Sequence, residues 1–335
     1  MGPLGTRRHA RHRRGDPVLP EPPGDRIAYG IQLPVQSQST LYTEPWERTA
    51  AGPEDLVEVA RAADRAGFAY VAVCDHVAVP RRLAGAMSTV WYDPVATLAF
   101  LASVTRRVRL LSHVAVVGLR HPLLTAKQYA TLDHLSGGRL ILGVGAGHVA
   151  EEFAALGVDF AERGRVLDES LDALRAALGP AEFPRFTGEY FRFADLGQRP
   201  RPAQPQVPLW VGGSSPAALR RAARRGDGWL PQGDPRTVLP RRIARLRELR
   251  EAAGIARPLV IGAIAEPLYI GDPPWEVGGR TLSGPPGALA ESLRAYPAMG
   301  VHQLQVRFRS RDRAELIDQM EAFASDVAPF LSSDH

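Results

Sequence analysis

Asp75 and His76 form an acid–base pair directly after a predicted buried strand, residues 70–74. An imidazole titrates near neutral pH and a carboxylate can fix its tautomer, so this pair could orient and protonate a bound ring. The residues also fit a second interpretation, in which Asp75 caps a helix and His76 lies half-buried beside it. The pair is therefore a candidate catalytic site with a structural alternative.

A glycine-rich turn, Gly143-Val144-Gly145-Ala146-Gly147-His148, follows a second predicted strand. Glycines allow backbone N–H groups to approach a ligand closely. The turn fails as a dinucleotide fingerprint because its third glycine comes two residues after the second instead of three, and the expected ribose-binding acid is missing. A purely structural turn is the alternative interpretation.

The segment Gly212-Gly213-Ser214-Ser215-Pro216 ends another strand and opens a predicted helix that runs through Arg225. Backbone N–H groups, two hydroxyls and the positive end of the helix converge there, which predicts an anion site suited to phosphate. A simple Ser-Pro helix cap would produce the same sequence.

His113 lies within a β-branched strand, where a histidine is more often a core residue than a catalyst. The histidines at 76, 113 and 148 follow separate strands and do not cluster with carboxylates at metal-ligand spacing. We therefore expect no metal site.

Short apolar runs alternate with segments of helical period, which predicts strand-helix units around a parallel sheet. We expect a (β/α)₈ TIM barrel in preference to a doubly wound sheet, since residues 34–49 after the first strand contain no glycine for a phosphate loop. The predicted strands are Ile27–Leu33, Tyr70–Cys74, Val108–Val117, Leu140–Gly143, Leu209–Val211, Gly228–Leu230, Leu259–Ile264 and Gln303–Phe308.

Helix signals support the same pattern, with prolines at positions 53, 94 and 122 opening helices and Gly137-Gly138 ending one. Two irregular insertions interrupt it, Gly179 to Pro208 after strand four and Pro267 to Gly287 after strand seven. We expect both to reach the active-site face as a lid or substrate wall.

Charge and cysteine content limit the classes of function and the cellular locations to be expected. Residues 1–26 hold six Arg against three acids and so supply +3 of the net charge of +5, which gives little support for nucleic-acid binding. The expected domains are a disordered basic tail, 1–25, and a barrel, 26–330. The single cysteine, Cys74, and the lack of an apolar leader predict a cytoplasmic protein with no membrane partner.

Taken together, these segments resemble the luciferase-like monooxygenase superfamily, particularly its coenzyme F420-dependent branch. The resemblance covers residues 26–325. The segments that carry it are Gly30-Ile31-Gln32-Leu33-Pro34, Asp75-His76-Val77, Arg120-His121-Pro122, Leu132 to Arg139 running into Leu142-Gly143-Val144-Gly145, Gly212-Gly213 and Gly226-Asp227-Gly228-Trp229.

The resemblance implies a cofactor ring across the barrel mouth, backed by a bulge in strand three with a non-proline cis peptide, which we place at His113–Val114. Several family members carry an acidic proton donor where His148 stands, so the role of this histidine is open. By analogy, the residues that contact the cofactor are Asp75 and His76 at the ring edge, Gly145, Ala146 and Gly147 beside its side chain, Gly212, Gly213, Ser214 and Ser215 at the phosphate, Gln32 facing the pocket and Trp229 near the tail.

The resulting hypothesis is hydride transfer between F420 and an organic small-molecule substrate, with His76 and His148 handling the proton and Asp75 assisting. An FMN-dependent monooxygenase of the same fold is the first alternative, and a non-catalytic ligand-binding barrel is the second. We also expect a homodimer. The substrate is set by the insertions, whose shapes the sequence does not specify.

Overall fold

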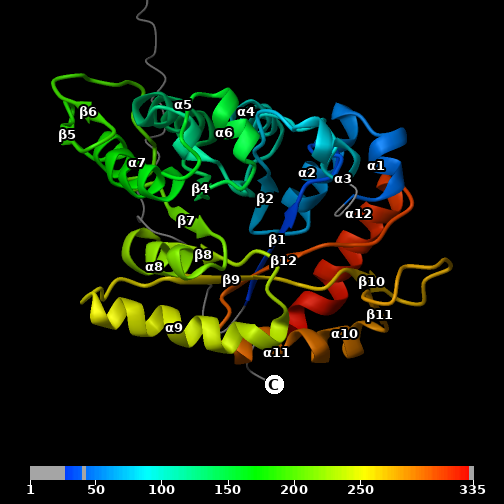
Figure 1. Ribbon diagram of the computed structural model, residues 1–335. Coiled ribbons are helices and arrows are strands. Elements are labelled where there is room, and N and C mark those ends of the chain that lie inside the picture. The colour runs from blue at the N-terminus through cyan, green and yellow to red at the C-terminus, as the bar shows by residue number, and fades with distance from the viewer. Residues whose placement is uncertain (1–26, 40–42, 332–335) are drawn as a thin grey trace, which may run out of the picture.

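Eight parallel strands form a closed barrel, as the alternating pattern predicts (Figure 1). The computed structural model describes residues 27–39 and 43–331, so the predicted tail, 1–25, lies outside the described residues. Around the barrel the order is β1-β12-β9-β8-β7-β4-β3-β2. The strands are β1 Ala28–Gln32, β2 Tyr70–Val73, β3 Arg109–Ser112, β4 Leu140–Val144, β7 Leu209–Gly212, β8 Gly228–Leu230, β9 Val260–Ile264 and β12 Gln303–Val306.

All eight predicted strands are confirmed, and the third shows the largest difference in length. The sequence predicts a strand over residues 108–117, whereas β3 ends at Ser112 and only Ala115 returns to the sheet, as a bridge to Val144. The peptide bond between His113 and Val114, which follow Ser112, is cis.

Successive side chains alternate between the barrel interior and the surrounding helices. On the outer side, buried aliphatic residues such as Val71, Leu110 and Leu142 join the main core. The interior holds a separate small cluster that contains Tyr70, Ala72, Leu111, Ile141, Trp210 and Leu230.

Helices cover the outside of the barrel, and proline stands in the first turn of most of them. This placement is favourable because the first-turn N–H has no intrahelical acceptor. Within the described ranges no helix is both long and apolar enough to cross a membrane. The helices are α1 Pro45–Thr49, α2 Pro53–Arg65, α3 Ala84–Met87, α4 Pro94–Val104, α5 Pro122–Ser136, α6 Ala150–Ala155, α7 Arg163–Leu178, α8 Pro216–Arg225, α9 Leu239–Ala252, α10 Pro286–Leu293, α11 Ala295–Ala298 and α12 Arg313–Ala322.

The first insertion forms an antiparallel hairpin of β5 Phe186–Thr187 and β6 Arg192–Phe193. It follows α7 and not β4 directly, so it starts at the amino-terminal side of the barrel. The Glu169 carboxylate of α7 accepts N–H groups from all three residues 189–191, which fixes the hairpin along the outside of that helix.

The second insertion leaves the carboxyl end of β9 and contains a parallel pair, β10 Leu268–Ile270 and β11 Leu282–Gly284. Leu268 donates its N–H to the Arg307 carbonyl, and Arg309 donates to the Leu268 carbonyl. These bonds attach the insertion beyond the end of β12, on the active-site face predicted for it. Figure 1 shows the two insertions at opposite sides of the molecule.

Candidate active site

The carboxyl ends of four adjacent strands, β2, β3, β4 and β7, carry most of the predicted site residues. Asp75 and His76 follow β2, His113 follows β3, Gly145 follows β4 and Gly212 ends β7. Residues spread over more than 130 positions of sequence are therefore brought to one arc of the barrel rim, as the TIM-barrel prediction requires.

Asp75 is committed to Arg120 and not to His76. Its buried carboxylate accepts Nη1 and Nη2 of Arg120 at 2.6 and 2.8 Å, and the N–H of Val116 at 2.8 Å. The predicted Asp75–His76 acid–base pair is thus corrected, because the bidentate guanidinium and the amide occupy the carboxylate. The observed role of Asp75 is to hold the chain after the β3 bulge.

The carboxylate that pairs with His76 belongs to Glu152, which the sequence reasoning missed. His76 Nδ1 lies 3.2 Å from Glu152 Oε2, and Glu152 Oε1 accepts the N–H groups of Val77 at 2.5 Å and Ala78 at 3.1 Å. Burial alone would raise the pKa of Glu152, but the hydrogen bonds from His76 and these amides lower it. Its place in the first turn of the helix after the glycine-rich turn is a signal that could have found it.

His148 and Trp91 surround the His76 ring. The ring centroids lie 5.4 Å apart for His76 and His148 and 4.6 Å apart for His76 and Trp91, both in edge-on geometry. Partial removal from water and the neighbouring His76 lower the pKa of His148, whereas Glu152 opposes that shift. Two imidazoles, one of them paired with the Glu152 carboxylate, therefore lie together at the ends of β2 and β4, where imidazoles can transfer protons. Within the described ranges no group of three His, Cys, Asp or Glu is placed to hold a metal ion.

The cis peptide bond predicted at His113–Val114 is confirmed. The Val114 side chain occupies space that only glycine leaves open on the neighbouring strands. A Cβ built on Gly145 would lie 2.4 Å from Val114 Cγ2, and one on Gly212 would lie 2.7 Å from Cγ1. The glycine-rich turn therefore has a packing reason at Gly145 in addition to ligand access. Val114 links the two predicted cofactor-binding turns.

His113 is buried and neutral. Burial lowers its pKa to about 4, and its Nε2 lies 3.1 Å from the amide nitrogen of Gln232. A carboxamide nitrogen can only donate, so Nε2 is the acceptor and Nδ1 carries the proton. Nδ1 has no hydrogen-bond partner among the described residues. Gln232, also missed by the sequence reasoning, connects this ring to the predicted anion site.

The turn before α8 has the features of an anion site. Gln232 N–H donates to Ser214 Oγ at 3.0 Å, and Ser215 Oγ caps the helix by accepting the Ala218 N–H at 3.2 Å. No hydrogen bond within the described residues uses the N–H groups of Ser214, Ser215 or Ala217. Free amides at the positive end of a ten-residue helix favour a phosphate.

Trp229 contacts this turn from the protein core. Its fully buried indole donates Nε1–H to the Gly213 carbonyl at 2.9 Å and belongs to the main core. A side chain without exposed surface offers nothing for a ligand to contact, so the predicted direct role at the cofactor tail is corrected to positioning of Gly213.

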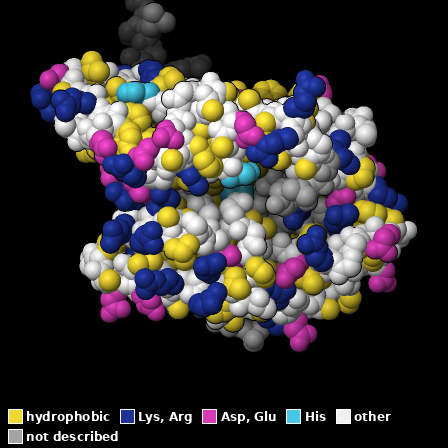
Figure 2. Space-filling model, viewed as in Figure 1, with side chains coloured by type: hydrophobic (Ala, Val, Ile, Leu, Met, Phe, Trp, Pro, Cys, Tyr) yellow, Lys and Arg dark blue, Asp and Glu magenta, His cyan; other side chains and the backbone are white. Residues whose placement is uncertain are grey.

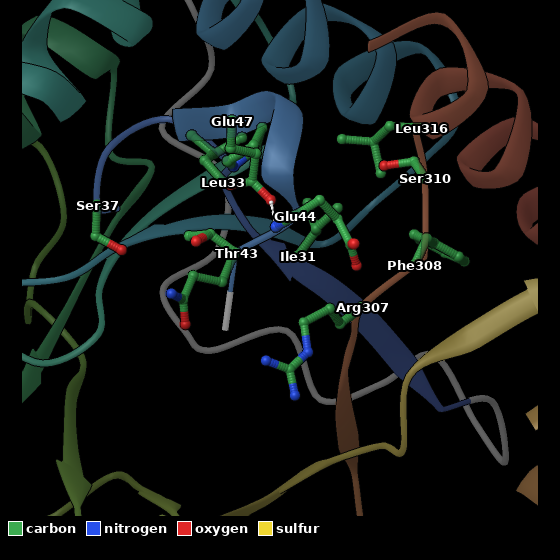
Figure 3. Close-up of a pocket in the computed structure, with 12 residues that line it drawn as sticks. Ile31, Leu33, Ser37, Thr43, Glu44, Glu47, Arg307, Phe308, Ser310 and Leu316 are labelled. Carbon is green, nitrogen blue, oxygen red and sulfur yellow. Dashed lines mark hydrogen bonds between the residues drawn. The ribbon is translucent and has the colours of Figure 1, made fainter. Parts of the chain in front are cut away.

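Gln32 is partly buried and lines a small pocket at the carboxyl ends of β1 and β12. Figure 3 shows Glu44 and Glu47 on one side of this pocket and Arg307 on another. Burial raises the pKa of Glu47 to about 7, although hydrogen bonds from the Glu44 and Val35 amides act in the opposite direction. Gln32 thus lines a pocket at β1 and β12, and its contact with the cofactor stays a prediction.

The remaining residues of the glycine-rich turn, Ala146 and Gly147, have different structural reasons for their positions. Ala146 is partly buried against the core, and Gly147 has φ of +74°, a left-handed conformation that suits glycine.

Figure 2 shows the molecule hollowed between α3 to α7 above and α8 to α10 below, with histidine side chains in the hollow. The partly exposed Gly213 and Ser214 and the exposed Ser215 leave the anion turn open.

These features fit a phosphorylated ring cofactor. The free amides before α8 match a phosphate, the unpaired Nδ1–H of buried His113 matches a ligand acceptor, and glycines flank Val114 where a Cβ would collide. Donors without acceptors are costly when buried, so a ligand that supplies acceptors is the expected complement.

Comparisons with known proteins agree with this fold. Residues 27–277 match the model of the family described as luciferase-like monooxygenase, and the chain belongs to this family. An uncharacterised protein of Mycobacterium tuberculosis is 35% identical over 224 residues, which cover 62% of this chain and 76% of the relative.

Two named relatives cover more of the chain. The F420-dependent glucose-6-phosphate dehydrogenase of Intrasporangium calvum is 29% identical over 341 residues, covering 85% of this chain and 98% of the relative. The structure of the monooxygenase RslO1 from Streptomyces bottropensis is 25% identical, with a TM-score of 0.76 over 90% of this chain and 99% of that one. The chain is thus similar both to an F420-dependent dehydrogenase and to a monooxygenase.

Proposed function

We propose that this protein is an oxidoreductase that transfers a hydride between coenzyme F420 and a small organic substrate. The observation that carries the proposal is the Val114 side chain between Gly145 and Gly212, directly beside a helix start with unused N–H groups. The similarity to an F420-dependent glucose-6-phosphate dehydrogenase supports the choice of cofactor.

Most of the residues assigned to the cofactor act through their backbone, and His113 acts through its side chain. The N–H groups of Ser214, Ser215 and Ala217 would bind its phosphate, Nδ1–H of His113 would donate to a ring acceptor, and the backbone at Gly145–Gly147 would flank the ring side chain. When bound, F420 supplies the hydride chemistry. The chain would position the cofactor and the substrate, set the polarity of the site and transfer protons.

His76 is assigned to proton transfer because its partner leaves one ring nitrogen available. Nδ1–H is donated to the ionised Glu152, so Nε2 is left to accept or donate a proton at the substrate. Glu152 is in turn fixed by the Val77 and Ala78 amides, and it acts as a positioning residue. His148 is the second imidazole through which a proton can reach solvent.

An FMN-dependent monooxygenase is the second candidate, favoured by the similarity to RslO1. The cofactor choice is tested by titrating the protein separately with F420 and FMN and following fluorescence. Saturable binding of F420, and no oxygen uptake beyond that of reduced FMN without protein, is the expected result. Tight FMN binding together with substrate-dependent oxygenation, and no response to F420, would overturn the proposal.

The proton-transfer role of His76 is tested by substitution. His76→Asn should lower kcat by about 10²-fold or more because it removes the acid–base group. Glu152→Gln should lower kcat less and shift the pH profile, because the imidazole remains but loses its anionic partner. His134→Asn, on the exposed face of α5, is the control and should retain full turnover. Equal turnover of His76→Asn and the control would exclude the role.

A further inference from the structure

The end of the barrel opposite the active site contains a layer of large polar side chains that point inward. Tyr70 of β2, Trp210 of β7 and Gln303 of β12 fill this layer, and neighbouring glycines make room for them. A Cβ on Gly30 would lie 2.4 Å from the Tyr70 ring, and one on Gly228 would lie 2.5 Å from the Trp210 ring. The interior is shaped around these three side chains.

Their polar atoms make no well-formed hydrogen bond, although the Gln303 side chain lies close enough to the Tyr70 hydroxyl to act on its pKa. Tyr70 Oη, Trp210 Nε1, Gln303 Nε2 and Gln303 Oε1 are buried and make no hydrogen bond among the described residues. The three side chains are only 1%, 5% and 2% exposed. Burial raises the pKa of Tyr70 and the neighbouring Gln303 side chain opposes that shift, so the hydroxyl stays protonated and can donate. An unpaired buried donor carries the full cost of its lost hydration.

Arg109 adds a cation to the same layer. It is the register neighbour of Tyr70 across β2 and β3, and its buried Nε has no partner among the described residues. Its Nη2 donates to the Leu140 carbonyl and to Gln204 Oε1 at 3.2 and 2.8 Å, neither of which is an anion.

Asp133 is the carboxylate that acts on Arg109 from a distance. Burial lowers the pKa of Arg109 and Asp133 opposes that shift. The Asp133 oxygens accept the N–H of Leu140 and both the N–H and side-chain amide of Gln204, so they are used within the protein. The guanidinium is thus left without a contacting counter-ion among the described residues.

A small cavity lies among these groups. It is about 30 Å³ in volume, where a single water molecule needs roughly 10–15 Å³. Its rim is partly exposed at the amino ends of the strands, which gives access from solvent. The lining residues are Ala28, Ala69, Tyr70, Arg109, Ile141, Trp210, Val260, His302 and Gln303.

We propose that this cavity binds a small monovalent anion of the size of chloride. Trp210 Nε1, Arg109 Nε and the Gln303 amide nitrogen can only donate, Tyr70 Oη can donate or accept, and the Gln303 oxygen can only accept, so donors are in the majority. Donors beside a guanidinium that no carboxylate contacts favour an anion over water. The cavity volume excludes a nucleotide or sugar phosphate.

The experiment combines crystallography with thermal unfolding. Crystals soaked in bromide should show one anomalous peak between Arg109, Tyr70 and Trp210, and chloride should raise the melting temperature saturably against gluconate at fixed ionic strength. Tyr70→Phe should weaken the apparent affinity by about tenfold or more, because it removes one hydrogen bond to an anion. Arg109→Met should abolish the chloride dependence.

Tyr29→Phe is the matched control, since the Tyr29 hydroxyl donates to the Ala66 carbonyl outside the cavity. It should keep the wild-type chloride dependence. Should Arg109→Met fail to fold, the Tyr70→Phe titration and the bromide map still decide. Ordered water without an anomalous peak, or an equal chloride response in Tyr70→Phe and Tyr29→Phe, would overturn the proposal.

Discussion

At the residue scale, burial and partners decide what each histidine can do. His76 is paired with an ionised Glu152, whereas His113 is buried against the neutral Gln232 amide and its pKa falls to about 4. The first arrangement suits proton transfer, and the second suits a fixed neutral ring. The residue type alone would not distinguish the two roles.

The pKa of His113 predicts acid sensitivity. An unfolded histidine has a pKa near 6.5, so between about pH 6.5 and 4 the unfolded chain binds more protons than the folded one, and stability falls as pH falls. Urea unfolding at pH 7 and pH 4.5 should show that His113→Gln loses less stability than the wild type, by roughly 2–3 kcal/mol. Parallel losses in the two proteins would contradict the prediction.

At the element scale, the β3 bulge and the turns after β4 and β7 form one packed unit. Val114 contacts the positions of Gly145 and Gly212, and Asp75 holds the Val116 amide of the same bulge. A substitution in any one of these elements should therefore change the packing of the others and the free energy of unfolding.

Gly145→Ala tests this unit, because the new Cβ would lie 2.4 Å from Val114 Cγ2. Overpacking should lower the free energy of unfolding by about 1–3 kcal/mol. Adding Val114→Ala should recover part of that loss, a coupling that a double-mutant cycle measures in urea. Gly85→Ala, where no atom lies within 4 Å, should be close to neutral. Additive losses in the cycle would show that the two residues are independent.

At the scale of the whole molecule, Asp227 joins distant parts of the chain. Its buried carboxylate pairs with Arg175 of α7 and Arg257 before β9, and it accepts the Leu209 N–H at 2.9 Å at the start of β7. The carboxylate thus connects α7, which precedes the first insertion, with β7 and the segment before β9, which follow it.

Asp227→Ala should lower the free energy of unfolding by about 3–5 kcal/mol, because it leaves guanidinium groups without their buried partner. Glu182→Ala, which breaks an exposed pair with Arg199, should cost no more than about 1 kcal/mol. Chemical unfolding of both variants measures the contrast. Equal losses would show that Asp227 does not hold the barrel together.

The sequence determined the barrel because strand and helix periodicity are local. Eight apolar runs, the prolines that open helices and the glycines at residues 137, 145 and 212 were all readable without contacts. The resemblance in motifs placed the cis bond at His113–Val114, and the residue types at Gly212–Ser215 predicted an anion turn there. These features depend on residues adjacent in the chain.

Tertiary structure alone decided the partners of the site residues. Glu152 pairs with His76 across 76 positions, and Gln232 reaches His113 across 119. Asp75, which the sequence assigns to its neighbour His76, binds Arg120 instead. Adjacent residues at a strand end point in different directions, and only closure of the barrel determines which distant side chains face each of them.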